Sequence, residues 1–108
     1  MKITIWSDFA CPYCYIGETR LYNAIADLGV TDRVTVEYKA YELAPDASPE
    51  AQASTTAQRM AGKYRIPLKE AEEKIAGIEQ LGADLNLDMK LATARASSTR
   101  DALSLIHI

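Results

Sequence analysis

The apolar and polar positions of the first half of the chain predict two strands with a helix between them. Residues 2–7, KITIWS, alternate and place Ile3 and Ile5 on one side, as in a half-buried strand. From about residue 11 the apolar positions recur at spacings of three and four, as in an amphipathic helix: Leu21, Ala24, Ile25 and Leu28. Gly29 follows, where a helix commonly ends in a left-handed cap. Residues 33–43, RVTVEYKAYEL, alternate again, so we predict a βαβ unit with parallel strands.

The second half of the chain predicts helices. Residues 44–50, APDASPE, form a turn-rich connection, and Ser48, Pro49 and Glu50 are typical of a helix start, so we predict a helix over 50–66. Pro67 begins another helix, whose apolar stripe recurs at spacings of three and four: Leu68, Ala71, Ile75, Ile78, Gly82 and Leu85. Residues 85–90, LNLDMK, predict a break, and Ser97 or Ser98 is expected to cap a last helix.

Length and charge narrow the class of protein. The 108 residues suit one small domain, and the net charge of -3 comes without a basic cluster, so we expect no nucleic-acid partner. No apolar run approaches the roughly 20 residues that span a bilayer, and the first residues lack the apolar core of a secretory signal. We therefore expect a cytoplasmic protein with no membrane partner. In that compartment a close cysteine pair is more often catalytic or metal-binding than structural.

The chain has two cysteines, Cys11 and Cys14, in the sequence Cys-Pro-Tyr-Cys at the predicted junction of strand and helix. This context indicates a redox pair. We expect Cys11 at the first helical turn, where free N–H groups and the helix dipole would hold its pKa below the reference of about 8.5. Pro12 suits the first helical position because its missing N–H would have no partner there. Cys14, one turn later and more buried, would resolve the mixed disulfide formed by Cys11.

The sequence gives less support to other functions of the two cysteines. A zinc site needs four ligands, and the chain adds only His107 to the two thiols, so zinc would have to be shared between subunits. Attachment of a c-type haem needs histidine directly after the second cysteine, where this chain has Tyr15. Two inert buried cysteines remain the alternative to a redox pair.

Residues near the motif and near the end of the second predicted strand are expected to have structural roles. Asp8 precedes Cys11 by three positions, and capping of the helix start is a simpler role for it than proton exchange with Cys14. Trp6, the single tryptophan, is expected in the core, and Tyr38 and Tyr41 are expected to pack near the end of the second strand.

The motif and its flanks resemble a known family. SDFACPYCYIG, the following helix, VTVEYKAYEL, an acidic loop with prolines and helices ending near STRDAL resemble the FrnE-like branch of the DsbA-family thiol-disulfide oxidoreductases over about residues 2–103. The resemblance implies an α/β, thioredoxin-like fold with a helical insertion. It also implies the site residues: catalytic Cys11 and Cys14, tuning residues Pro12 and Tyr13, and substrate-binding Phe9 and Tyr15. It implies no resident cofactor, and a substrate that is a thiol or disulfide of a protein or small molecule, with glutathione as a candidate co-substrate.

The chain departs from the family pattern in its second half. A complete thioredoxin fold adds an antiparallel strand pair, a final helix and a cis-proline loop, yet none of the four prolines follows the insertion. We therefore expect a fold without the C-terminal half of the core: a βαβ part at 1–48, a helical insertion at 49–102 and a tail at 103–108. The tail, LSLIHI, resembles a translated transposase mosaic end, so we expect it to be non-native and His107 to have no role. A genuine C-terminal helix is the alternative.

Several functions stay open on these grounds. A thiol-disulfide oxidoreductase is favoured, because both cysteines are present. A glutathione-dependent isomerase or transferase is the alternative, because related enzymes with the same insertion use bound glutathione, although they usually have serine at the position of Cys11. The third is an inactive truncated fragment or a binding module. With two parallel strands and an unpaired sheet edge, the chain is expected to fold poorly, to form a homodimer or aggregate, and to exchange thiols slowly.

Overall fold

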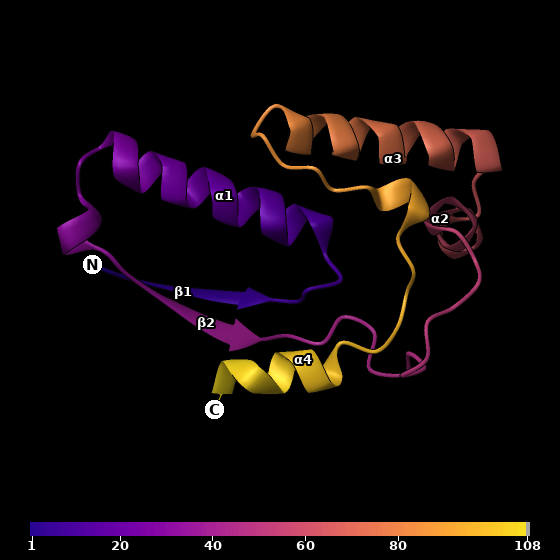
Figure 1. The fold of residues 1–108 in the computed structure, drawn as a ribbon, viewed down its shortest axis with the longest axis horizontal. Helices are drawn as coiled ribbons and strands as arrows, with labels where there is room; N and C mark the ends of the chain where they lie inside the picture. The colour runs from indigo at the N-terminus through magenta and orange to yellow at the C-terminus, as the bar shows by residue number, and fades with distance from the viewer. Residues whose placement is uncertain (108) are drawn as a thin grey trace. The chain divides into compact units, whose positions relative to one another are not determined.

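The computed structural model describes residues 1–107 and divides into two compact units. The first unit contains Met1–Asp46 and the C-terminal segment from Thr99, and the second contains Ala47–Ser98. The predicted division into 1–48, 49–102 and a separate tail at 103–108 stays a prediction. Helices and one short sheet make up the structure, as expected for the α/β class (Figure 1).

The first unit contains the predicted βαβ unit. Strand β1 (Lys2–Ser7) pairs in parallel with β2 (Thr35–Ala40), with Ile3 opposite Val36 and Ile5 opposite Tyr38. Helix α1 (Pro12–Asp27) connects the strands and runs alongside them (Figure 1). Within residues 1–107 the sheet has these two strands.

Helix α1 ends as the sequence predicts. Gly29 has φ +66°, its N–H donates to the carbonyl of Ala26, and the N–H of Val30 donates to the carbonyl of Ile25 at 3.2 Å. These bonds satisfy carbonyls that have no partner inside the helix. Glycine suits this position because it adopts a positive φ without the strain that a side chain brings. The tight end turns the chain back toward β2.

Trp6 does not lie in the core, contrary to the prediction. Its side chain is 63% exposed, while Ile3 and Ile5 are half-buried. The strand alternation places Trp6 on the same face as Lys2, which forms an ion pair with Glu37 of β2 at 2.7 Å. The face of the sheet that carries Trp6 is therefore largely polar.

The second unit is a small helical cluster. Its core consists of Ala57 from α2 (Thr56–Tyr64) and Ala71 and Ile75 from α3 (Leu68–Ala83). The predicted stripe of α3 is confirmed at its buried positions: Ala71, Ile75, Ile78 and Gly82. Gly82 leaves room for Met89, whose sulfur would lie 2.5 Å from a Cβ at that position. The predicted break after α3 is also confirmed, with Asn86 and Lys90 at positive φ.

Helix α2 begins later than predicted. Thr55 is its N-cap, and Thr55 and Gln58 form a capping box: the Gln58 N–H donates to Thr55 Oγ1 at 3.1 Å, and the Thr55 N–H donates to Gln58 Oε1 at 2.9 Å. The hydroxyl of Ser48 instead accepts from the N–H of Glu50 at 3.2 Å, which makes a local turn. Ser48 therefore starts a turn and not a helix.

The last elements of the first unit are α4 (Arg100–Ser104) and the 3₁₀ turn Leu105–His107. Thr99 is the N-cap of α4 and makes no side-chain capping bond, so the predicted cap at Ser97 or Ser98 is wrong. Leu103 is buried, and His107 Nε2 accepts from the N–H of Ala40 at 3.2 Å. The predicted non-native origin of 103–108 stays a prediction, and Ile108 lies outside the described residues.

Candidate active site

The Cys-Pro-Tyr-Cys motif begins helix α1. Cys11 is the N-cap residue, and Pro12 occupies the first helical position, as predicted. The Cys14 N–H donates to Cys11 Sγ at 3.3 Å. One of the free N–H groups of the helix start therefore points at the sulfur, where it can stabilise negative charge. The two residues lie one helical turn apart, which is the spacing that a redox pair needs.

Both cysteines are free thiols of intermediate exposure. The predicted contrast between an exposed Cys11 and a buried Cys14 is therefore absent. Neither residue is fully buried, and the two thiols are hydrogen-bond partners of each other. The difference between their roles must come from position and charge.

The pKa of Cys11 is raised above its ordinary value, contrary to the prediction. Burial is the largest cause, and a hydrogen bond to Cys14 and the charge of Cys14 add to the rise in pKa. Hydrogen bonds from the backbone at Cys14 and Tyr13 lower the pKa of Cys11, but they do not outweigh burial. The sequence indicates that Cys11 lies at a helix start, but it does not indicate that the thiol is partly buried.

The pKa of Cys14 is lowered below its ordinary value. Burial and, to a smaller extent, the charge of Asp8 raise this pKa, but hydrogen bonds with Cys11, with the backbone at Asp8 and with Ser7 outweigh them. Because each thiol is the other's hydrogen-bond partner, the first ionisation belongs to the pair. The direction of the Cys14 shift means that the Cys11 thiol acts as a donor toward the ionised Cys14.

This coupling predicts opposite shifts in two single variants. Cys14→Ala should lower the pKa of Cys11, because the bond and the charge that raise it disappear. Cys11→Ala should raise the pKa of Cys14, because its hydrogen bond from Cys11 is lost. Alkylation rates measured against pH, resolved by residue in a mass spectrometer, would show both shifts. A shift of the same sign in both variants would contradict the coupling.

Asp8 is not the helix cap that the sequence predicted, since Cys11 takes that position. Asp8 is 3% exposed, and its carboxylate accepts from the N–H of Ala10 at 3.2 Å and from the N–H of Leu43 at 2.8 Å. Sequence reasoning missed the contact with Leu43 because 35 residues separate the partners. The alternation of apolar and polar residues predicts strands, but it cannot predict a hydrogen bond between two loops.

Exposed aromatic side chains lie in and beside the motif. Phe9 and Tyr15, the predicted substrate contacts, are 66% and 51% exposed, and the tuning residue Tyr13 is also exposed. Tyr41 is exposed as well, so its predicted packing role is wrong. The side chains of these residues are available to a bound molecule, and their roles in binding stay predictions.

A polar contact joins α1 to β2. The Tyr38 hydroxyl donates to Glu18 Oε1 at 2.6 Å and lies 3.2 Å from the Tyr22 hydroxyl. Burial, followed by the bonds to Glu18 and Tyr22, raises the pKa of Tyr38 far above its ordinary value. The Tyr38 hydroxyl therefore stays protonated and acts as a donor. Glu18 lies one turn beyond Cys14, so this bond helps to seat the helix that carries the thiols.

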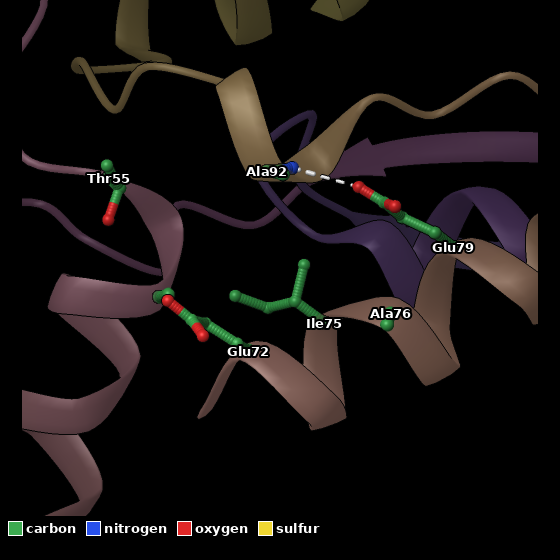
Figure 2. A pocket seen from close by; sticks show the side chains of 7 residues that line it. Thr55, Glu72, Ile75, Ala76, Glu79 and Ala92 are labelled. Atoms are coloured by element: carbon green, nitrogen blue, oxygen red, sulfur yellow. Dashed lines mark hydrogen bonds between the residues drawn. The ribbon is translucent and has the colours of Figure 1, made fainter. Parts of the chain in front are cut away.

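A shallow cavity of about 270 Å³ lies within the second unit (Figure 2). Its lining contains no cysteine and consists of Thr55, Ala57, Glu72, Ile75, Ala76, Glu79 and Ala92. Glu79 turns its carboxylate to the N–H of Ala92, from which it accepts at 2.9 Å (Figure 2).

Among residues 1–107, no three His, Cys, Asp or Glu side chains gather where they could hold a metal ion. No helix in that range is long and apolar enough to cross a bilayer.

A parallel βαβ unit with a Cys-Pro-Tyr-Cys pair at its helix start defines a thioredoxin-like domain. The chain belongs to the family of the DSBA-like thioredoxin domain, whose family model matches residues 2–108. It is similar to the solved structure of a probable DsbA oxidoreductase from Streptomyces coelicolor, with 29% identity and a TM-score of 0.89. That match covers 99% of this chain and 45% of the other chain. No match was found among the curated proteins.

These comparisons confirm the predicted fold class, α/β and thioredoxin-like, and the resemblance to the DsbA family. The FrnE-like branch stays a prediction. Because this chain spans less than half of the similar structure, the activity of that whole protein does not transfer to it directly.

Proposed function

We propose that the chain carries out thiol-disulfide exchange with Cys11 and Cys14 as its dithiol and disulfide pair. The supporting observation is the helix start, where Cys11 Sγ accepts the N–H of Cys14 at 3.3 Å. This bond holds the two residues one turn apart, within reach of a disulfide after a small movement. Membership of the DSBA-like family supports the same chemistry.

The proposed reaction has two balanced steps. The Cys11 thiolate attacks one sulfur of a substrate disulfide, a mixed disulfide forms, and the first substrate thiolate leaves. The Cys14 thiolate then attacks Cys11 Sγ, the mixed disulfide breaks, and the second substrate thiolate leaves. The substrate gains two electrons and the pair becomes a disulfide. The reverse sequence oxidises two substrate thiols to a disulfide and reduces the Cys11–Cys14 disulfide; the two thiols belong either to one protein or to two molecules of a small thiol such as glutathione.

We assign the first attack to Cys11 although the pKa directions favour charge on Cys14. Cys11 lies at the N-cap, at the end of the loop that carries the exposed residue Phe9, whereas Cys14 lies within the helix. A single proton shared by the pair can pass from Cys11 to Cys14 when a substrate sulfur approaches. The backbone N–H groups at Tyr13 and Cys14 then stabilise the Cys11 thiolate.

Cys14→Ser should trap the first intermediate, because the resolving sulfur is gone. The reduced variant, mixed with glutathione disulfide, is expected to accumulate one glutathione per chain at Cys11. The parent should pass through this species and finish as the Cys11–Cys14 disulfide. Quenching with acid followed by mass spectrometry would show both products.

The matched control is the double variant Cys11→Ser with Cys14→Ser, which should take up no glutathione. A parent that stays reduced with excess glutathione disulfide, together with no adduct on Cys14→Ser, would refute the proposed function. An adduct on Cys11→Ser, with none on Cys14→Ser, would show that Cys14 makes the first attack and Cys11 resolves the mixed disulfide.

A further inference from the structure

Among residues 1–107, Asp8 is the one buried residue that carries charge. We propose that Asp8 is a positioning residue for the thiol pair: its carboxylate fastens the loop before Cys11 to the backbone of Leu43, in the segment after β2. The expected effect of Asp8 on disulfide exchange rests on the proposed function. Its effect on the placement of Cys11 rests on the geometry of the loop alone.

The bonds of Asp8 extend the connection between the strands beyond the sheet. Pairing ends with Ser7 opposite Ala40, and the Tyr41 N–H still donates to the Ser7 carbonyl at 3.0 Å. Asp8 is the next residue, and from there its side chain makes the bond to Leu43. It thus joins the two loops at the carboxyl ends of parallel strands, where ligand sites of α/β proteins usually lie.

The same residue holds the start of the motif. The Asp8 carbonyl accepts the N–H of Cys11 at 3.2 Å, and Oδ1 accepts the N–H of Ala10. Cys11 reaches its extended N-cap conformation, with φ -99° and ψ 108°, directly after this turn. A shift of Asp8 would therefore move Cys11 Sγ relative to Cys14.

A carboxylate is specifically suited to this position, because both side-chain partners are N–H donors. Each carboxylate oxygen accepts one bond, and bonds to a charged acceptor are about twice as strong as neutral ones. Asparagine has nearly the same shape but only one acceptor oxygen, so its NH₂ group would face an N–H. Asp8→Asn therefore breaks one of the two links while leaving the volume almost unchanged.

The loss of a link should have two separate effects, one on the reactivity of Cys11 and one on the closure of the disulfide. Burial is the largest cause that raises the pKa of Cys11, so a loosened loop, which admits water, should make this thiol more reactive. Closure of the disulfide needs Cys14 aligned with the mixed disulfide on Cys11. Misplacement by about 1 Å can slow such an aligned step by about 100-fold, so a slower closure is expected.

The experiment compares the parent with Asp8→Asn, Asp8→Ala and the control Asp27→Asn, which removes an exposed charge from α1. Each reduced chain reacts with glutathione disulfide, and the rate at which Cys14 resolves the glutathione adduct is followed by acid quenching and mass spectrometry. Alkylation of Cys11 by iodoacetamide is measured in a Cys14→Ala background, which needs no exchange activity. Unfolding curves give the folded fraction for each variant.

We expect Asp8→Asn to slow closure at least about tenfold and to speed alkylation of Cys11, with Asp27→Asn unchanged. Equal closure and alkylation rates per folded molecule in Asp8→Asn and Asp27→Asn would overturn the proposal, even if Asp8→Asn lowers the unfolding midpoint. If the parent does not exchange with glutathione, the proposed function fails separately. The alkylation rates then decide: faster alkylation in Asp8→Asn supports positioning, and an unchanged rate overturns it.

Discussion

Cys11→Ser should abolish disulfide exchange and leave the fold intact. The hydroxyl that replaces the thiol cannot form a mixed disulfide, so the first step is lost completely. Serine is also a strong N-cap residue, and its oxygen can accept the Cys14 N–H that Cys11 Sγ accepts in the structure. Helix α1 therefore keeps its start. The loss can then be assigned to the missing sulfur and not to unfolding.

The measurement is reduction of insulin by the chain in the presence of dithiothreitol, compared with dithiothreitol alone. Cys11→Ser should fall to the rate of dithiothreitol alone, with an unfolding curve like that of the parent. Cys14→Ser serves as the comparison, since it should still form adducts although it turns over poorly. Parental rates in Cys11→Ser, with loss in Cys14→Ser, would show that the first attack comes from the thiol with the lowered pKa.

The local elements were predictable because their signals lie close together in the sequence. Alternation around Ile3 and Ile5 indicates β1, and a glycine at position 29 indicates the end of α1. The position of Cys11 at the N-cap follows from the same reasoning, since Pro12 fits only the first turn of a helix. Short-range geometry thus places both sulfurs.

Two competing local signals explain the wrong start of α2. Ser48 with Pro49 and Glu50 has the composition of a helix start, but so does Thr55 with Gln58 three residues later. The capping box satisfies two backbone N–H groups, and the turn at Ser48 satisfies one. The sequence contains both signals, and the stronger one determines where the helix begins.

The rest of the site depends on contacts between distant segments. The bond from Leu43 to Asp8 spans 35 residues, and the bond from Tyr38 to Glu18 spans 20. The raised pKa of Cys11 has the same origin, since burial is decided by tertiary packing. A helix start predicts a lowered pKa for a capping thiol only where water still reaches it. Composition and spacing carry no information about that burial.

Ile16→Ala should destabilise the first unit strongly. Ile16 is 2% exposed and is the largest fully buried side chain among the described residues, two positions after Cys14 in α1. Truncation of a buried isoleucine to alanine costs about 2–5 kcal/mol, because apolar burial is lost and a cavity remains. Whole domains are stable by only about 5–15 kcal/mol, so this change removes a large share.

The matched control is Leu28→Ala, at the end of the same helix. This change also shortens an aliphatic side chain, but Leu28 is 76% exposed. It should change the free energy of unfolding by no more than about 0.5 kcal/mol. Urea unfolding followed by circular dichroism would compare the two variants with the parent. Because α1 contains Cys14 and is capped by Cys11, Ile16→Ala should also expose both thiols to alkylation at urea concentrations where Leu28→Ala still protects them. Equal unfolding midpoints for the two variants would show that α1 is not held to the unit through Ile16.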